Sequence, residues 1–204
     1  MDEAALIHSA REGDLNSFNR LVLEYQEGAF NVALRMLGEV PAAEDAAQTA
    51  FISAYRSLHQ YRGGSFKAWV LRMVTNACYD ELRRRKRRPT VPLDGDTEGD
   101  EPALEESLAA ADPGAPEPQL ALEQLELEHA IQHCLDALPV EFRAAVILAD
   151  IEGLDYDDIA RASGTPLGTI KSRLARARFK LRDCLRSFEE LLPARFRLMN
   201  EDKE

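Results

Sequence analysis

A long stretch without lysine or arginine divides this 204-residue chain and most restricts how it folds. Residues 1–88 carry thirteen basic and eleven acidic groups, and residues 143–204 carry twelve and eleven. Residues 89–142 between them carry fourteen acidic groups and no basic one. The net charge of −11 therefore conceals a strong segregation of sign along the chain. Because phosphate contacts need Lys and Arg, this layout predicts two polyanion-binding modules joined by an acidic segment.

The acidic segment contains a stretch that is unsuited to folding. Residues 89–118 hold six prolines among Asp, Glu, Gly and Ala, and no aromatic residue. Such a composition buries too little apolar surface to offset the entropy of ordering, which predicts a flexible acidic linker. We therefore expect a first domain at 1–88, a second at 119–187 and a tail at 188–204. The tail is predicted to pack on the second domain as an amphipathic helix, with a regulator site as the alternative.

Apolar residues recur at helical spacing in both modules, and no strand-like alternation of any length occurs. The fold class is therefore predicted to be all-α, with two small helical domains. In the first, Asp14 and Ser65 are expected to cap helices, Gly28 to end or bend one, and Pro41 to begin another. In the second, helices are expected at 119–137, 140–151, 156–162 and 166–186, with Asp155 and Thr165 as N-caps and Pro166 at a first helical position.

Residues 156–178 have the pattern of a helix-turn-helix, with a Ser-Gly turn between a short helix and a longer one. The longer helix has an apolar stripe for the core, formed by Ile170, Leu174, Ala177 and Leu181. Its opposite face carries Gly168, Ser172, Ala175, Arg176 and Phe179, with Lys171, Arg173 and Arg178 beside it. Short donors flanked by cations are typical of a helix that reads bases in the major groove. A solvated basic face is the alternative.

The helix after Pro41 has a second informative face. Ala47, Ala50, Phe51, Ala54 and Leu58 form its core side, whereas Asp45, Gln48, Thr49, Ile52 and Arg56 form a stripe on the other side. This stripe fits a partner surface or a plain solvent face equally well. In the next helix we expect Phe66, Val70, Met73, Val74 and Ala77 to point inward. Trp69 is expected in the core rather than as a platform for base stacking.

Several classes of function lack support in the sequence. No Ser/His/Asp or Cys/His arrangement and no Gly-rich phosphate loop indicates an enzyme, and no cofactor is implied. No apolar run approaches the roughly 20 residues that span a bilayer. Three scattered cysteines fit a reducing cytoplasm. His129, His133 and Cys134 lack a fourth ligand, so side chains on a helix facing solvent or a partner are favoured over a metal site.

Three blocks of the first module and three of the second resemble the extracytoplasmic-function sigma factors of the bacterial sigma-70 family. The sequences AEDAAQTAF (43–51), FKAW (66–69) and NACYD (76–80) with the arginines after them resemble region 2. The sequences LP (138–139), GLDYDDIA (153–160) and GTIKSRLARAR (168–178) resemble region 4. The resemblance covers both modules in the right order and leaves only the linker and the tail unmatched.

This resemblance implies a transcription initiation factor that binds core RNA polymerase and directs it to promoters, as part of a stress or envelope response. The surface that docks on the clamp coiled coil of the largest subunit would comprise Asp45, Gln48, Thr49 and Ile52. The −10 element would be held by Tyr61, Lys67, Trp69, Asn76, Asp80, Arg83 and Arg84. The −35 element would be contacted by Thr169, Lys171, Ser172, Arg173, Arg176 and Arg178. Ala175 is smaller than the family's usual residue, and Tyr61 and Phe66 are the only aromatic residues of the −10 loop.

The resemblance also implies a cytoplasmic protein without direct membrane insertion, held by a cognate anti-sigma factor that is often membrane-anchored. Two other functions fit part of the sequence. A helix-turn-helix regulator that does not replace a sigma factor would leave the Asp45 stripe and the block from Trp69 to Arg88 unexplained. A protein that sequesters polymerase without touching DNA would leave the arginines of 171–178 without a role.

Overall fold

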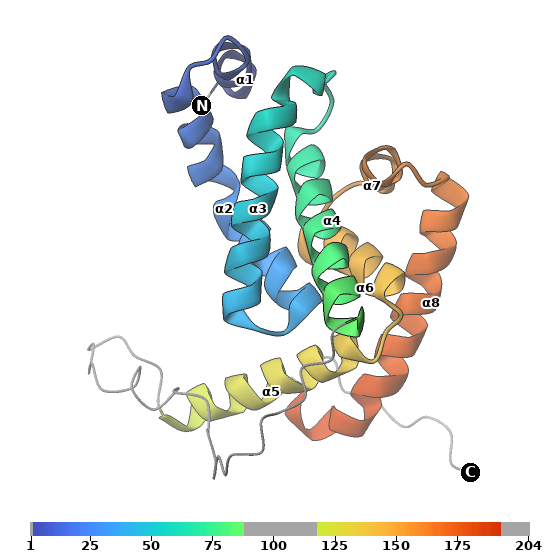
Figure 1. Cartoon of the computed structure of the whole chain (residues 1–204). Helices are drawn as coiled ribbons and strands as arrows, with labels where there is room; N and C mark the ends of the chain where they lie inside the picture. The colour runs from blue at the N-terminus through green and yellow to red at the C-terminus, as the bar shows by residue number, and fades with distance from the viewer. Residues whose placement is uncertain (1, 88–117, 193–204) are drawn as a thin grey trace.

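The computed structural model describes residues 2–87 and 118–192, and within them every regular element is helical (Figure 1). The first module comprises α1 (Glu3–Arg11), α2 (Leu15–Leu37), α3 (Val40–Ser57), a 3-10 turn η1 (Leu58–Gln60) and α4 (Phe66–Arg87). The second comprises α5 (Pro118–Asp136), α6 (Val140–Val146), a π-helical turn η3 (Ile147–Ile151), α7 (Tyr156–Ser163), α8 (Leu167–Leu185) and a 3-10 segment η4 (Arg186–Leu191). The all-α prediction is confirmed. None of these described helices combines the length and apolarity needed to cross a bilayer.

Local signals set most of the helix ends. The Asp14 carboxylate accepts hydrogen bonds from the Asn16 and Ser17 backbone N–H groups at the start of α2. The Ser65 hydroxyl accepts one from the Ala68 N–H at 3.1 Å, at the start of α4. Gly38 ends α2 in the left-handed region at φ +77°, which glycine adopts without a steric penalty.

Three local predictions are wrong: that Gly28 ends a helix, that Thr165 caps α8 and that Pro166 is its first residue. Gly28 does not end a helix, because α2 continues through it to Leu37. Pro166 precedes the first residue of α8 and occupies the cap position expected of Thr165. Asp155 does stand at the N-cap of α7, although its side chain makes no capping hydrogen bond. The flexible linker predicted at 89–118 lies outside the described residues except for Pro118, as does the tail from residue 193.

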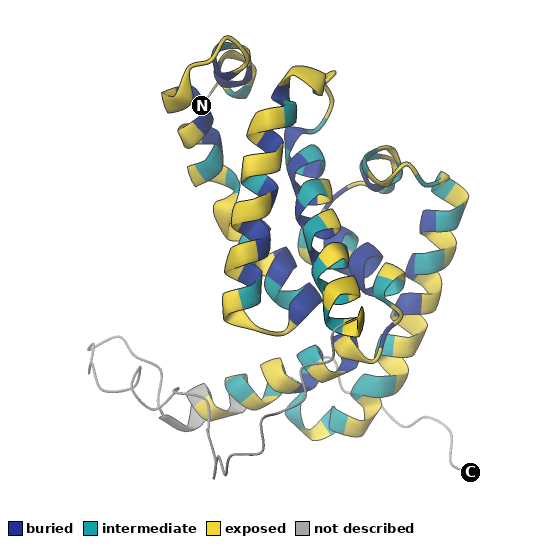
Figure 2. Cartoon of the chain, in the orientation of Figure 1, coloured by how far each residue is buried: buried dark blue, intermediate teal, exposed yellow. Residues whose placement is uncertain are grey.

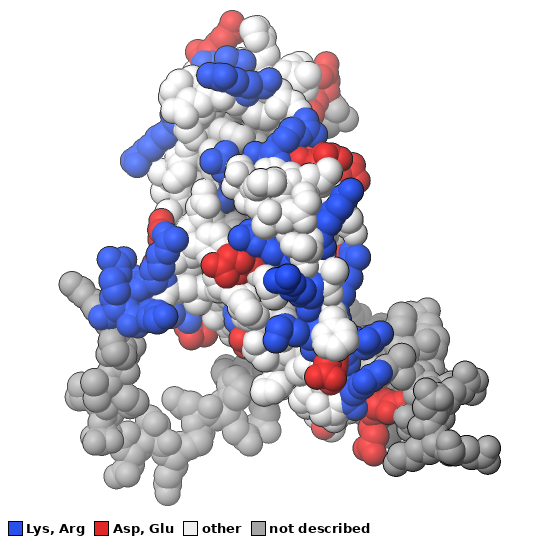
Figure 3. Space-filling model, turned by 90° about the vertical axis from the view of Figure 1, so that its right-hand side faces the viewer, with Lys and Arg blue, Asp and Glu red and all other residues white. Residues whose placement is uncertain are grey.

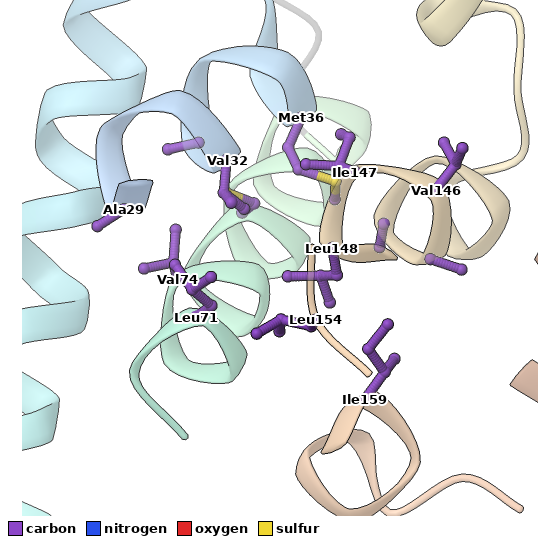
Figure 4. Packing of buried hydrophobic residues seen from close by; sticks show 14 of the residues in the cluster. Ala29, Val32, Met36, Leu71, Val74, Val146, Ile147, Leu148, Leu154 and Ile159 are labelled. Atoms are coloured by element: carbon purple, nitrogen blue, oxygen red, sulfur yellow. The ribbon is translucent and has the colours of Figure 1, made fainter. Parts of the chain in front are cut away.

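The two modules share one hydrophobic core. Its buried side chains come from α2, α3 and α4 on one side and from α5, α6, η3, α7 and α8 on the other. Met36 of the first module lies beside Ile147 of the second, and Leu71 and Val74 of the first lie on the side of the core that holds Leu154 of the second (Figure 4). Buried residues line the facing sides of these helices, whereas their outer sides are exposed (Figure 2). A second cluster, built from α1 and the adjacent parts of α2, α3 and α4, stabilises only the first module.

The carboxyl end of α2 joins the modules through polar contacts. The last four carbonyls of a helix lack partners within it, and burial makes each one costly unless it accepts a hydrogen bond. Gly38 N–H donates to the Leu34 carbonyl at 2.8 Å. Gln132 Nε2 of α5 donates to the Arg35 carbonyl at 3.2 Å. Arg143 Nη1 of α6 donates to the Met36 carbonyl at 2.8 Å, and Arg85 Nη1 reaches the Leu37 carbonyl at 3.5 Å. Two of the four partners therefore belong to the second module.

The cysteines differ from the sequence-based expectation. Cys134 of α5 and Cys184 of α8 form a disulfide across 50 positions of sequence, and Cys78 remains free and buried in α4. Burial raises the pKa of the Cys78 thiol to about 12, so it stays protonated. His133 packs its ring against Phe188, with centroids 5.8 Å apart, so the beginning of the predicted tail does contact the second module. Spacing in the sequence gave no indication of the disulfide, because its two helices meet only in the folded module.

Replacement of Arg143 should destabilise both modules together. Its side chain is 9% exposed, pairs with Asp136 at 2.7 Å and caps the Met36 and Asp136 carbonyls. Arg143→Ala leaves buried acceptors without a donor, and we expect a loss of about 3 kcal/mol in unfolding free energy by urea denaturation. Arg161→Ala removes an exposed arginine and should change the unfolding free energy by less than about 0.5 kcal/mol. Equal midpoints for the two variants would contradict the capping role.

Candidate nucleic-acid interface

Helix α8 presents the arrangement expected of a recognition helix. Ile170, Leu174 and Ala177 are buried against α6 and α7, and Leu181 is half-buried, as the sequence predicts. Gly164 takes the left-handed conformation at φ +63° in the turn that precedes α8. The exposed side of α8 carries Gly168, Lys171, Ser172, Ala175, Arg176 and Phe179. The face of the molecule that bears α8 is rich in Lys and Arg (Figure 3).

The cations of α8 fall into two groups. Lys171, Arg173 and Arg176 form no ion pair with any residue that the structure describes. Arg178 instead binds Asp150 through two hydrogen bonds, at 2.9 and 2.5 Å, and donates to the Tyr156 hydroxyl at 2.9 Å. These bonds raise the pKa of Arg178 further above its ordinary value. Lys171, Arg173 and Arg176 are thus available to a ligand, whereas Arg178 is already engaged. Thr169 is half-buried, and Ser172 donates its hydroxyl to the Thr169 carbonyl.

The predicted polymerase-binding stripe lies on the outer side of α3. Asp45, Gln48, Thr49 and Ile52 are all exposed, and Ile52 is an apolar side chain that is 48% accessible. Asp45 and Thr49 also line a groove of about 870 Å³ between α3 and α4. Asp80 and Arg84 line the other wall of this groove. The stripe and part of the predicted −10 set therefore form one continuous surface.

The candidate −10 residues separate into exposed and packed side chains. Asn76, Asp80, Arg83 and Arg84 are exposed on α4. Tyr61 is buried, and its hydroxyl donates to the Gly64 carbonyl at 2.6 Å. Its ring packs against Phe66 and Trp69 with centroids 5.4 Å apart. The structure thus places Tyr61 and Trp69 in an aromatic cluster that holds the loop after η1 against α4.

Internal carboxylates partly neutralise the arginine cluster at the end of α4. Glu81 accepts hydrogen bonds from both Arg84 and Arg85, and these bonds hold its pKa below the usual range. Arg85 also reaches Glu39, at 2.9 and 3.1 Å, and Arg83 lies 3.5 Å from Asp80. The pairs with the exposed carboxylates Asp80 and Glu39 are worth at most about 1 kcal/mol each. They therefore order the side chains but would yield readily to phosphate.

Lys67 makes the closest polar contact between the modules. Its ammonium lies 3.0 Å from the Glu152 carboxylate and donates to the Glu152 carbonyl at 2.7 Å. The Glu152 side chain is only 8% exposed. A Cβ atom at Gly28 would stand 3.0 Å from Glu152 Oε2, so glycine in the middle of α2 makes room for this carboxylate. A residue predicted to hold promoter DNA is thus occupied by the other module.

Sequence reasoning missed Glu152, Arg143 and the purpose of Gly28. A glycine inside an otherwise regular helix was a usable signal, because it costs about 1 kcal/mol relative to alanine and so implies a close approach. No comparable signal marked Glu152 or Arg143. Their partners are 85 and 107 positions away, and no periodicity connects them.

The geometry defines a class of protein: two helical modules, each with an exposed helix face suited to nucleic acid. Two family models match these modules, "Sigma-70 region 2" over residues 21–88 and "Sigma-70, region 4" over residues 128–181. Together they cover more than half of the chain and contain all the candidate site residues. The first spans the stripe on α3 and the exposed side of α4, and the second spans α7 and the exposed side of α8.

Curated relatives give a more specific placement. The chain is 38% identical to "ECF RNA polymerase sigma factor SigE" of Mycolicibacterium smegmatis, over 83% of this chain and 62% of that protein. It is 37% identical to "RNA polymerase sigma-H factor" of Pseudomonas aeruginosa, over 85% of this chain and 88% of the relative. It is 35% identical to "ECF RNA polymerase sigma factor SigW" of Bacillus subtilis, over 88% of this chain and 95% of the relative. The chain belongs to the extracytoplasmic-function sigma factors of the sigma-70 family, which initiate transcription by binding core RNA polymerase and promoter DNA.

Solved structures share the fold. One is the sigma factor RpoE in complex with the anti-sigma factor NepR from Bartonella quintana, at TM-score 0.60 and 25% identity, over 84% of this chain and 98% of that one. Another is CnrH in complex with the cytosolic domain of CnrY, at TM-score 0.63 and 21% identity, over 90% of this chain and 96% of that one. The second of these supports the fold alone.

Gly28→Ala should loosen the contact between the modules. The added Cβ meets the Glu152 carboxylate at 3.0 Å and displaces it from Lys67, although alanine by itself favours the helix. We expect a larger radius of gyration by small-angle X-ray scattering. Gly168→Ala is the matched control, because a Cβ there has no neighbour within 4 Å among the described residues. If both variants stay as compact as the parent chain, Gly28 does not serve this contact.

Proposed function

We propose that this sigma factor contacts the −35 element with α8, the −10 element with α4 and the polymerase clamp with the exposed stripe of α3. One observation carries the proposal: each module exposes a helix face rich in hydrogen-bonding side chains, and the shared core leaves these faces uncovered over most of their length. Residues 1–88 would act on the −10 element and residues 119–187 on the −35 element, with residues 89–118 as the connection.

Contact with the −35 element would rest on three side chains of α8. A major groove about 12 Å wide admits one helix, and arginine binds guanine with two hydrogen bonds. Arg176 is exposed at the middle of the outward face and is the candidate for such a contact. Lys171 and Arg173 lie to either side and would bind phosphates. Arg178 would support the module through Asp150, and a phosphate contact would compete with that pair.

Contact with the −10 element would rest on the exposed side of α4. Asn76 has amide groups for an unpaired base, and Arg83 and Arg84 have charge for the backbone. Lys67 would join them after release from Glu152. Tyr61 and Trp69 would act by holding the loop in place, because their rings pack on each other and on Phe66.

Simultaneous contact with both elements requires the modules to separate. Elements roughly 25 base pairs apart are about 85 Å apart along B-DNA, at about 3.4 Å per pair. The structure packs α4 directly against α7, within a core shared by both modules. The compact arrangement is therefore the form without promoter. Polar contacts such as Lys67 with Glu152 can exchange for water or phosphate as the modules part.

We further infer a cytoplasmic protein with no catalytic role, regulated by an anti-sigma factor. One similar structure, the sigma factor RpoE from Bartonella quintana, is a complex with the anti-sigma factor NepR. The relatives are named as RNA polymerase sigma factors. A response to stress or to the cell envelope accords with these relatives.

Run-off transcription with purified core polymerase tests the proposal, and Asp45→Arg tests the docking surface. The chain should yield promoter-specific transcripts only with core enzyme and bind duplex promoter weakly by itself. Asp45→Arg reverses an exposed charge on α3 and should weaken binding to core polymerase at least tenfold by fluorescence anisotropy, with an unchanged circular dichroism spectrum. Arg20→Glu, an exposed charge reversal on α2, is the control. Binding to a palindromic operator without core polymerase would favour the regulator alternative.

Arg176→Ala should relax sequence preference at the −35 element. Loss of a bidentate base contact costs about 1–3 kcal/mol of discrimination. We expect the ratio of transcripts from intact and altered −35 sequences to fall by the factor that corresponds to this free energy. Lys171→Ala should instead weaken binding to all promoters alike. It should also lower the slope of the logarithm of the binding constant against the logarithm of salt concentration by about one. Arg182→Ala, on a side chain that stacks on Phe179, should preserve the ratio. An unchanged ratio in Arg176→Ala would remove this residue from base recognition.

A further inference from the structure

A cavity of about 510 Å³ lies at the junction of the two modules. Helix α4 forms one wall, and residues of α6, α7 and α8 form the other. Its volume falls within the range of small-molecule sites, about 300–1,000 Å³. None of the side chains assigned to polymerase binding lines it. The compact arrangement therefore contains a cavity that the candidate polymerase contacts do not account for.

The floor of this junction cavity is apolar. Side chains from both modules form it: Ala68, Ala144, Ala145, Leu148, Leu154 and Ile159. Leu148, Leu154 and Ile159 lie close together on this side of the shared core (Figure 4). Burial raises the pKa of the Tyr79 hydroxyl on the same wall to about 12, so this group stays neutral. Such a floor stabilises the apolar part of a ligand and offers no polar contact to a hydrated ion.

The lining also carries an excess of positive charge. Arg72, Arg83 and Lys86 come from α4 and Arg173 comes from α8, against a single carboxylate, Glu141. In the part of the chain that the structure describes, three of these cations have no ion pair, and Arg83 has only a weak one at 3.5 Å. These cations would attract an acidic head group, while the floor would take the apolar remainder.

We propose that the junction cavity binds a small anionic amphiphile, a molecule with an apolar body and one acidic head, carboxylate or phosphate. An apolar floor beside unpaired cations matches both halves of such a ligand. A free phosphate would use only the cations, and a neutral apolar molecule would use only the floor.

Binding of this ligand is coupled to the arrangement of the modules. Because both modules supply walls, the complete site exists only while they are in contact. A ligand that binds one of two arrangements shifts the equilibrium toward that arrangement. Asn76, Arg83 and Arg173 line the cavity and also belong to the candidate promoter contacts. The amphiphile would therefore hold the sigma factor compact and oppose promoter binding, a consequence that rests on the proposed function.

Fluorescence titration of the full chain with 11-(dansylamino)undecanoic acid tests the site without any transcription. We expect saturable binding of one probe, displaced by dodecanoate and by dodecyl phosphate. The more effective of these competitors identifies the preferred head. Dodecanol should compete at least tenfold less well, and inorganic phosphate should not compete. Displacement by phosphate alone, equal competition by dodecanol, or binding without saturation would overturn the proposal.

Two variants locate the site, and one serves as control. Ala162→Phe fills the cavity from a half-buried position on α7, and Arg173→Glu reverses a lining charge. Each should weaken binding at least tenfold, with folding verified by circular dichroism. Arg20→Glu makes the same charge reversal away from the cavity and should bind as the parent does. Parental affinity in both lining variants would place the probe elsewhere and overturn the assignment.

A second pair of measurements separates the site from its consequence. Gly28→Ala, which is expected to part the modules, should bind the probe more weakly, and dodecanoate should restore its compactness in scattering. Dodecanoate should also lower run-off transcription by the parent chain more than by Ala162→Phe. Saturable binding without an effect on compactness or transcription would overturn the coupling and leave the site itself established. Failure of promoter-specific transcription without any amphiphile would count against the proposed function instead.

Discussion

The arrangement of this protein depends on how the carboxyl end of α2 is satisfied. The last four carbonyls of that helix have no partner within it, and a buried carbonyl is costly if it is left without a donor. Gln132 and Arg143 of the second module supply two of the donors, and Gly38 and Arg85 of the first supply the others. The end of one helix is thus completed only by the other module. The shared apolar core forms around this point and orients α4 toward α6, α7 and α8.

The compact arrangement determines which of the candidate contacts are exposed and which face the other module. It places Lys67 against Glu152 and Arg173 beside the junction cavity, so candidate promoter contacts from both modules face the interior of the pair. The stripe on α3 and the outer face of α8 remain exposed. The proposed polymerase surface is therefore accessible in the compact arrangement, whereas the proposed contact with both promoter elements requires the modules to part. The polar contacts between the modules can exchange for water, phosphate or a ligand, whereas separation of the modules also exposes apolar surface of the shared core.

The sequence predicted much of the fold because helices are specified locally. Asp14 and Ser65 cap the helices expected of them, and the apolar stripe of α8 is buried as its spacing indicated. Family motifs located the candidate contacts, and the structure exposes most of them. The predictions failed where a neighbour distant in sequence decides the outcome. Gly28 serves the approach of Glu152 rather than a helix end, and the Cys134 disulfide depends on where α5 meets α8.

The sequence by itself determined the all-α class, the division into two charged modules, the faces of the helices and membership of the sigma family. The first three follow from periodicity, capping and composition, which act over a few residues, and the family membership follows from the resemblance of the sequence motifs. Only the tertiary structure decided that the modules share a core, that Lys67 is engaged and that a cavity forms between them. These features join side chains 85 or 107 positions apart. Such contacts produce no periodicity in the sequence, because the packing of the folded chain determines which donor lies beside which acceptor.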